Sequence, residues 1–151
     1  GCYRVSLAQL LAGAPPRAVS GMRRDGATGV DEMFAGTIAY ENGVTCQFHC
    51  GFRAAHQAYL RLVGTEGVLD VHRPFRPERR EHLLLMRGGQ VEEVVVEGAP
   101  VFVDEVADME DAALGIRPPR ITLAESRLHA ATLEALHHAA REGETRRVPV
   151  P

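Results

Sequence analysis

Residues 33–52 read MFAGTIAYENGVTCQFHCGF, and this stretch decides the fold class. Apolar side chains recur at every second position on both sides of Asn42-Gly43, which is the spacing of strands that bury one face. Asn-Gly between two such runs is a strong signal for a β-hairpin. The stretch therefore predicts two antiparallel strands, one ending at Tyr40 and the other running from about Val44 to Phe52.

Shorter strands surround this hairpin on both sides. Gly64-Thr65-Glu66-Gly67 predicts a turn between two of them, and Gly88-Gly89 predicts a turn between two others. Residues 73–80, which include two prolines, predict a loop. The expected strands are Arg17 to Met22, Tyr59 to Val63, Val68 to His72, His82 to Arg87 and Val91 to Glu97.

Helical segments lie at the two ends of the chain. Gly13, followed by two prolines, predicts the end of the first helix, and Gly115 that of the second. Thr122 and Glu125 have the spacing of a capping box at the start of the third. The expected helices are Tyr3 to Leu11, Val103 to Leu114 and Thr122 to Arg141, followed by an extended tail from Arg146 to Pro151.

These elements predict one α+β domain that spans residues 1–151. We expect an open, mainly antiparallel β-sheet of about six strands with the helices on one face. Residues 83–86 and 94–96 are apolar at successive positions, so these strands are apolar on both faces. A sheet covered on one side only would leave the second apolar face in water. We therefore expect that face to pack against another subunit, which would make the protein a homo-oligomer.

Composition excludes several classes of protein. The chain has 151 residues and a net charge of −3, whereas nucleic-acid-binding proteins are usually basic, so we expect no nucleic acid as partner. No apolar run approaches the ~18 residues of a membrane span. Three cysteines are an odd number, which disfavours a disulfide framework and indicates a cytoplasmic protein. All 17 basic residues are arginine, so no lysine chemistry is available within this chain.

Two groups of residues could in principle ligate a metal. Cys46, His49 and Cys50 are close in sequence, but on a strand the two cysteines point to one face and the histidine to the other. The interpretation we favour is that the cysteines are small buried hydrophobes. His129, His137 and His138 lie on the long helix without a metalloprotease spacing, and we interpret them as structural or exposed. We therefore expect no metal site.

Two charged segments allow a second interpretation as binding sites. The helix from Val103 to Leu114 carries five acidic residues, and the loop at residues 73–80 carries four arginines. A solvated surface is the simpler interpretation of each, with a cation or general-base site and an anion site as the respective alternatives. The sequence contains no phosphate-binding glycine motif of the Gly-x-Gly-x-x-Gly or Walker type, so we expect no nucleotide pocket in this chain.

Taken in order, a set of short motifs resembles the C-terminal domain of the Gfo/Idh/MocA family of NAD(P)-dependent oxidoreductases, and its start is most similar to the branch with dihydrodiol and xylose dehydrogenases. The resemblance covers nearly the whole chain, and the ordered set is more specific than any single motif. The motifs are Gly1-Cys2-Tyr3, Val30-Asp31-Glu32, Phe52-Arg53, Val63-Gly64-Thr65-Glu66-Gly67, Pro74-Phe75, Phe102-x-x-Glu105-x-x-x-Met109 and Pro118-Pro119.

The resemblance implies a catalytic residue and the place of the cofactor. Gly1-Cys2-Tyr3 matches the last three positions of the family's Asp-x-Gly-x-Tyr motif, so Tyr3 would be the catalytic tyrosine. The aspartate of that motif would fall two residues before Gly1. The family's catalytic lysine belongs to a preceding Rossmann domain, which binds NAD or NADP. The resemblance therefore implies that the cofactor domain is missing from this chain.

The resemblance also implies a substrate-binding residue. Phe102 stands where the family often has an aromatic residue in an Asn-Pro-Tyr-like stretch, although this sequence reads Ala99-Pro100-Val101-Phe102. Phe102 would line the substrate pocket, with core packing as the alternative role. Met109 stands where phenylalanine is common in the family, a swap that a core can accommodate.

The expected function is that of the C-terminal domain of an oxidoreductase. Its parent would transfer hydride between NAD(P) and a sugar, polyol or similar small alcohol, and this chain alone would bind no cofactor and be inactive. The alternative is a stand-alone, dimerising binding or assembly module without catalysis. A metal-binding domain built on Cys46, His49 and Cys50 is a distant third.

Overall fold

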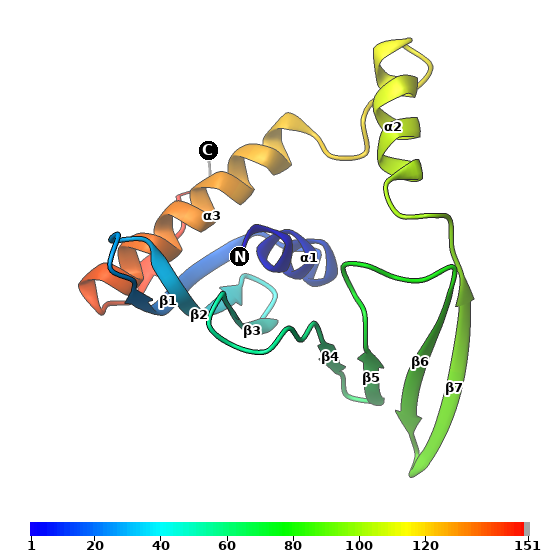
Figure 1. Cartoon of the computed structure of the whole chain (residues 1–151), viewed down its shortest axis with the longest axis horizontal. Coiled ribbons are helices and arrows are strands. Elements are labelled where there is room, and N and C mark those ends of the chain that lie inside the picture. The colour runs from blue at the N-terminus through cyan, green and yellow to red at the C-terminus, as the bar shows by residue number, and fades with distance from the viewer. Residues whose placement is uncertain (150–151) are drawn as a thin grey trace. The chain divides into compact units, whose positions relative to one another are not determined.

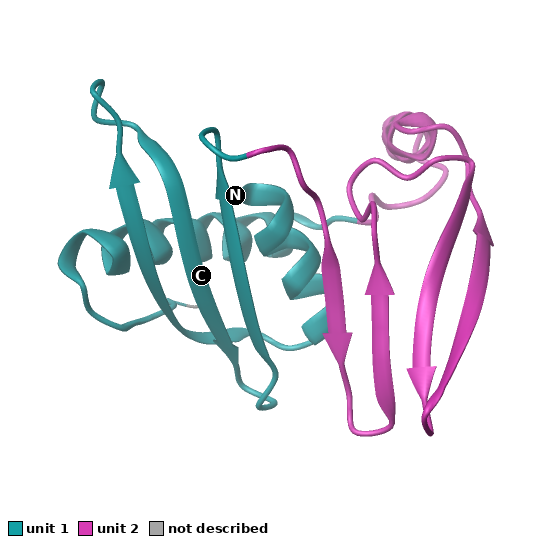
Figure 2. Ribbon diagram, turned by 60° about the horizontal axis from the view of Figure 1, so that its bottom comes forward, with its two compact units in different colours: residues 1–54, 121–151 teal, residues 55–120 magenta. Residues whose placement is uncertain are grey.

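The computed structural model describes residues 1–149, and its elements follow one another as Figure 1 shows. The chain divides into two compact units (Figure 2). Unit 1 combines residues 1–54 with the segment that starts at Ile121, and unit 2 comprises residues 55–120. The expectation of a single domain over residues 1–151 stays a prediction, and the last two residues of the expected extended tail lie outside the described residues.

Unit 1 contains a four-stranded antiparallel sheet in the order β3-β2-β1-β8. Its strands are β1 (Pro16–Asp25), β2 (Asp31–Tyr40), β3 (Thr45–Gly51) and β8 (Arg146–Arg147). The hairpin predicted at residues 33–52 is confirmed as β2 and β3. Gly43 has a φ of 88°, a conformation that favours glycine, and the Asn42 side chain accepts a hydrogen bond from the Val44 amide.

Helices α1 (Cys2–Ala12) and α3 (Leu123–Glu142) complete unit 1. Helix α1 ends at Gly13, which is left-handed, and α3 begins with the predicted capping box of Thr122 and Glu125. The core consists of inward side chains from both helices and from the sheet: Val5, Ala8, Ala12, Val19, Phe34, Ile38, Tyr40, Ala135, Leu136, Ala139 and Val148. Both helices therefore cover the same face of this sheet.

Unit 2 contains a second four-stranded antiparallel sheet, in the order β4-β5-β6-β7, and helix α2 (Val103–Ala113). Its strands are β4 (Leu60–Val63), β5 (Gly67–Val71), β6 (Arg80–Arg87) and β7 (Gln90–Glu97). No hydrophobic side chain of unit 2 is fully buried. The ladder places eight aliphatic residues on one face, here called the aliphatic face: Leu60, Leu62, Leu69, Val71, Leu83, Leu85, Val94 and Val96.

The structure corrects two details of the predicted architecture. The α+β class and the antiparallel pairing are confirmed, but eight strands form two sheets of four rather than one sheet of about six. Helix α2 belongs to unit 2 and has no buried residue, whereas α1 and α3 pack on the core of unit 1. Local alternation predicts a strand but not its partner, which is why the pairing of β8 with β1, across more than 120 residues, was not foreseen.

Candidate functional site

Tyr3 lies in the first turn of α1, and its side chain is 70% exposed. The start of this helix is attached to α3, because His129 Nε2 donates a hydrogen bond of 3.0 Å to the carbonyl oxygen of Cys2. Gly1 is the N-cap of the helix, and its carbonyl accepts the first helical hydrogen bonds from Arg4 and Val5. Tyr3 therefore projects from a backbone that a second helix holds in place.

The cysteines predicted to be buried hydrophobes do pack against the core. Cys46 and Cys50 lie on the core side of β3, and burial raises the pKa of the Cys46 thiol. His49 lies between them in sequence and on the opposite side of the strand. Within residues 1–149, no group of three His, Cys, Asp or Glu side chains could hold a metal ion.

Phe102 belongs to unit 2, where it caps the N-terminus of α2 and is 58% exposed. Its φ is 74°, the only positive φ of a non-glycine residue in the described chain. The left-handed conformation costs a bulky residue about 1–2 kcal/mol. Strain of this kind is most often kept at sites that bind or react. Tyr3 and Phe102, the two predicted site residues, thus belong to different units.

Part of each charged segment is engaged in ion pairs within unit 2. On the acidic helix, Arg117 contacts Asp111 at 2.7 Å and Asp108 at 2.8 Å, and its pKa is raised chiefly by the hydrogen bond to Asp111. In the arginine-rich loop, Arg73 pairs with Glu78 and with Glu81. For the residues in these pairs, the solvated-surface interpretation fits better than a cation or anion site.

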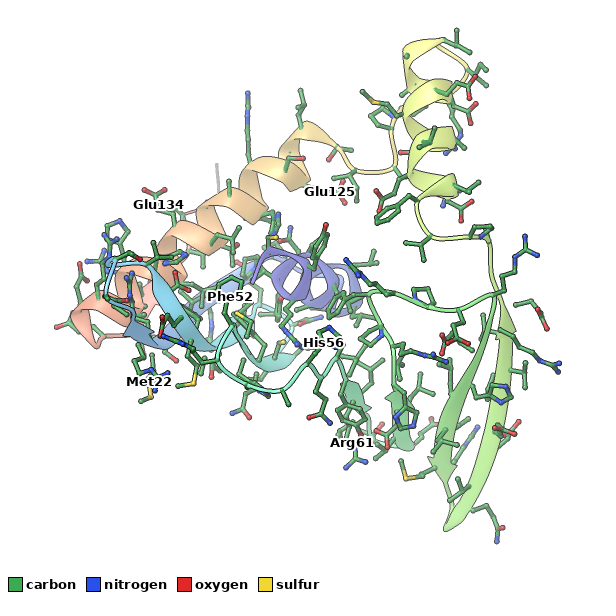
Figure 3. All side chains as sticks on the ribbon, viewed as in Figure 1. Met22, Phe52, His56, Arg61, Glu125 and Glu134 are labelled. Carbon is green, nitrogen blue, oxygen red and sulfur yellow. The ribbon has the colours of Figure 1, made fainter. Side chains whose placement is uncertain are left out.

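Sequence reasoning missed a polar cluster on β4 and β5. Asp70 is 5% exposed and accepts hydrogen bonds from Tyr59 at 2.5 Å and from two nitrogens of Arg61 at 2.7 and 2.6 Å. The Arg61 guanidinium and these bonds lower the pKa of Asp70 to about 2. The turn at Gly64–Gly67 sets the register that pairs Arg61 with Asp70. The position of this turn, combined with the alternation of side chains along both strands, could therefore have predicted that the two residues face each other. Figure 3 marks Arg61.

A hollow of about 420 Å³ opens on the face of the unit 1 sheet that is turned away from the core. Figure 3 shows Met22, one of its lining residues, on the side of the sheet away from α3. The cross-strand partners Ser20, Thr37 and Gln47 form one row of the lining, and Met22, Ala35 and His49 form the next. We call this feature the sheet-face hollow. Ser20, Thr37 and Gln47 were not singled out from the sequence, because isolated Ser, Thr and Gln residues on strands carry no signal there, and His49 was considered only as a metal ligand.

Helices in the described part of the chain, residues 1–149, all fall short of the length and apolar character needed to cross a membrane.

Comparison with known protein families finds a match for the first part of the chain. Residues 1–70 match the model of the GFO/IDH/MocA C-terminal domain. No curated protein matches the sequence. The matched region contains α1, strands β1, β2 and β3 of unit 1, and β4 and most of β5 of unit 2. It includes Tyr3 and ends at Asp70, whereas Phe102 lies beyond it.

Solved structures share the fold over most of the chain. Aldose-aldose oxidoreductase from Caulobacter crescentus, complexed with glycerol, aligns with 97% of this chain at 19% identity and a TM-score of 0.84. KijD10, a 3-ketoreductase from Actinomadura kijaniata in complex with NADP, aligns with 92% at 22% identity and 0.85. UDP-N-acetylglucosamine 3-dehydrogenase GnnA from Acidithiobacillus ferrooxidans aligns with 93% at 17% identity and 0.81.

At these identities the likeness establishes the fold, and activity does not follow from it. This chain spans 45% of the length of each of these three proteins. The match of residues 1–70 and the shared fold agree with the resemblance expected from the motif order. Over its residues 1–70, the chain is similar to the GFO/IDH/MocA C-terminal domain.

Proposed function

We propose that this chain is the C-terminal domain of an oxidoreductase that transfers hydride between NAD or NADP and a sugar, polyol or similar small alcohol. The observation that carries the proposal is the family match over residues 1–70, which begins at the helix that presents Tyr3. The three structural neighbours support it, since they are an aldose-aldose oxidoreductase, a 3-ketoreductase and a UDP-N-acetylglucosamine 3-dehydrogenase.

The dinucleotide belongs to a domain outside this chain. Both described sheets are wholly antiparallel, and none of α1, α2 and α3 follows a strand through a glycine-rich phosphate loop. Dinucleotide sites of the Rossmann type need a parallel sheet and such a loop at a helix N-terminus. The residues described here therefore do not fit a nicotinamide dinucleotide, and we expect the isolated chain to be inactive.

Tyr3 is the proposed proton-transfer residue. Oxidation of an alcohol removes a proton from the substrate oxygen, and a tyrosine hydroxyl beside a cation can take up that proton. The exposed Tyr3 side chain at the start of α1 is accessible to such a substrate. The His129 bond to the Cys2 carbonyl holds the backbone next to Tyr3 and so limits the positions that its hydroxyl can reach.

Phe102 is the proposed substrate-contacting residue of unit 2. Its ring is 58% exposed at a strained helix start, and strain of this kind is most often kept at sites that bind or react. The ring could cover the C–H face of a sugar or polyol, in keeping with the apolar lining of most small-molecule sites.

The aliphatic face of unit 2 is the proposed self-association surface. On this face Val96 is 44% exposed and the other seven residues are partly buried, and on the opposite side Val63, Val91 and Val95 are exposed at 74%, 67% and 41%. Large exposed apolar patches usually mark interfaces. This observation also favours the second candidate function, a dimerising assembly module without catalysis.

The experiment uses the protein that carries this sequence in its native cell. It would be purified through an antibody against residues 1–149 and assayed for NAD- or NADP-dependent oxidation of a panel of sugars and polyols. We expect turnover, and a Tyr3→Phe variant should lose about 10²- to 10⁴-fold in kcat, the usual contribution of a proton-transfer residue. Cys2→Ser is the matched control, because Cys2 contributes only its backbone carbonyl.

Two results would contradict the proposal. One is the absence of any cofactor-dependent turnover by the native protein, which would favour the assembly module. The other is a Tyr3→Phe variant as active as Cys2→Ser. The isolated chain, purified and assayed in parallel, should show no turnover.

A further inference from the structure

The arginine-rich loop at residues 73–80, which joins β5 to β6 in unit 2 (Figure 1), holds two arginines without a partner. Two of its four arginines pair with carboxylates, in the ion pairs Arg73–Glu78, Arg73–Glu81 and Arg80–Glu97. The side chains of Arg76 and Arg79 make no hydrogen bond or ion pair to any residue among residues 1–149. Both residues are exposed, so their charges are available to a ligand.

The backbone that carries these two arginines is held in place. The Glu81 side chain, on a residue that is 9% exposed, accepts a hydrogen bond of 2.5 Å from the Glu78 amide. The carbonyl oxygen of Arg79 accepts one of 2.8 Å from the amide of Gly98, the residue that follows β7. Two prolines within the loop restrict its backbone further. A ligand would therefore have little backbone to order, which favours binding.

Two unpaired guanidinium groups at this spacing suit a phosphate group. Arg76 and Arg79 are three residues apart, so their Cα atoms are separated by at most about 11 Å and both long side chains can reach one ligand. Each guanidinium donates through a planar fork that fits two oxygens of a carboxylate or a phosphate. One arginine is enough for a carboxylate, whereas a phosphate monoester has three free oxygens and about two negative charges at pH 7. A pair of unpaired arginines therefore favours the phosphate.

Other classes of ligand fit the loop less well. A neutral polyol would bring no counter-charge to Arg76 or Arg79. A nucleic acid would need a larger basic surface, but the chain has a net charge of −3 and the other two arginines of the loop are already paired with carboxylates. The charges of the loop thus match one compact anion.

We propose that Arg76 and Arg79 together bind the phosphate group of a small molecule that carries a phosphate monoester. Glu78, which lies between them in sequence, is paired with Arg73 and so does not neutralise either arginine. Free inorganic phosphate has the same chemistry, and the test below separates these two sources. The inference rests on residues of unit 2 alone and uses neither Tyr3 nor a dinucleotide. Either this proposal or the proposed hydride transfer can therefore fail while the other holds.

The test is an NMR titration of the whole chain, labelled with ¹⁵N, with glycerol 3-phosphate, inorganic phosphate, acetate and glycerol. We expect glycerol 3-phosphate to shift the Nε–H signals of Arg76 and Arg79 saturably, with a dissociation constant of about 1 mM, as befits so small a ligand at an open site. Inorganic phosphate should bind with an affinity within about threefold of this, and acetate at least about fivefold more weakly. Glycerol should leave the signals unchanged. A roughly tenfold rise in NaCl concentration should weaken the binding, because salt screens exposed charges.

Matched variants locate the site. Arg76→Gln and Arg79→Gln each remove one guanidinium group and should each weaken the binding of glycerol 3-phosphate about tenfold, the usual loss for a hydrogen bond to a charged group. Arg76→Lys keeps the charge without the planar fork and should restore only part of the affinity. Arg24→Gln is the control, because Arg24 on β1 is likewise exposed and unpaired in the described chain, but its neighbour Arg23 is paired with Asp25. Two Gln variants are used so that one misfolded protein, detected by its amide spectrum, leaves the other to decide.

Four outcomes would overturn the inference. The first is no saturable shift of the Arg76 and Arg79 signals with glycerol 3-phosphate up to roughly 100-fold above the expected dissociation constant. The second is equal affinity for acetate, which would mean that one negative charge is enough. The third is equal weakening by Arg24→Gln and Arg76→Gln, which would mean a general attraction of anions to exposed arginines. The fourth is binding of inorganic phosphate more than tenfold tighter than that of glycerol 3-phosphate, which would make the free ion the ligand.

Discussion

Arg61 stands directly opposite Asp70 across the β4–β5 ladder and donates two hydrogen bonds, of 2.7 and 2.6 Å, to its carboxylate. Tyr59 donates a third, and the Arg61 guanidinium lies 5.7 Å from the centre of the Tyr59 ring. In a unit without a fully buried hydrophobic side chain, this cluster is the most specific interaction between two strands. It should therefore govern how unit 2 responds to pH.

Acid should destabilise unit 2 through Asp70. The pKa of Asp70 is about 2 in the folded chain, because Arg61 and Tyr59 favour the carboxylate, and would be near 3.9 in the unfolded chain. The unfolded state then binds more protons, so stability present above about pH 4 is lost as the pH falls towards 2. Urea unfolding between pH 7 and pH 2 should show a shallower acid slope for Asp70→Asn than for the wild type. Equal slopes would contradict this, and Asp104→Asn is the control for removing one exposed acid.

The capping box should stabilise α3 measurably. The Thr122 hydroxyl accepts a hydrogen bond from the Glu125 amide, and Glu125 in turn accepts one from the Thr122 amide. Thr122→Ala should reduce the free energy of unfolding of unit 1 by about 0.5–2 kcal/mol, measured by urea denaturation. Thr65→Ala, in the exposed turn between β4 and β5, should have little effect, and an equal loss in both variants would rule out the cap as the cause.

Substitution of Phe102 should affect the stability of the chain and its binding of substrate in different ways. Glycine adopts a φ of 74° without strain, so Phe102→Gly should raise stability by up to about 1 kcal/mol, or leave it unchanged. If the ring contacts substrate, the same variant of the native protein should raise KM for the alcohol several-fold. Thermal unfolding and steady-state kinetics test the two parts. Lower stability with unchanged KM would assign Phe102 to packing.

The proposed interface can be tested with two adjacent leucines whose side chains lie on opposite faces of the unit 2 sheet. Leu83 lies on this face, whereas Leu84 faces the other side beside Asp70 and Glu93. Leu83→Arg should abolish self-association in sedimentation velocity experiments, because it places a charge in the centre of the proposed interface. Leu84→Arg should leave it intact. If the wild-type chain sediments as a monomer at all concentrations, or if both variants behave alike, this face is not the interface.

Signals confined to neighbouring residues predicted much of the fold. Asn42-Gly43 and Gly88-Gly89 placed two hairpin turns, Gly13 and Gly115 placed the ends of two helices, and Thr122 with Glu125 placed the start of α3. Each of these depends on backbone conformation within a few residues. Pairings between distant segments, such as β8 with β1, depend on long-range contacts that one sequence does not encode locally.

The candidate site shows the same limit. The motif at Gly1-Cys2-Tyr3 pointed to Tyr3, and the structure adds the bond from His129 on a helix more than 100 residues away. The convergence of Ser20, Thr37 and Gln47 requires the register of three strands, which the turns alone do not fix. A sequence motif was enough to identify Tyr3 as a candidate. Residues that become neighbours only when the strands pair, such as Ser20, Thr37 and Gln47, could not be identified in this way.

The most direct test of the central claim is the intact mass of the protein that carries this sequence in its native cell. If the chain is the C-terminal domain of an oxidoreductase, that mass should exceed 16.4 kDa by a nucleotide-binding domain of roughly 120 residues. A mass of 16.4 kDa would mean that the domain exists alone. It would contradict the proposed oxidoreductase and favour the assembly module.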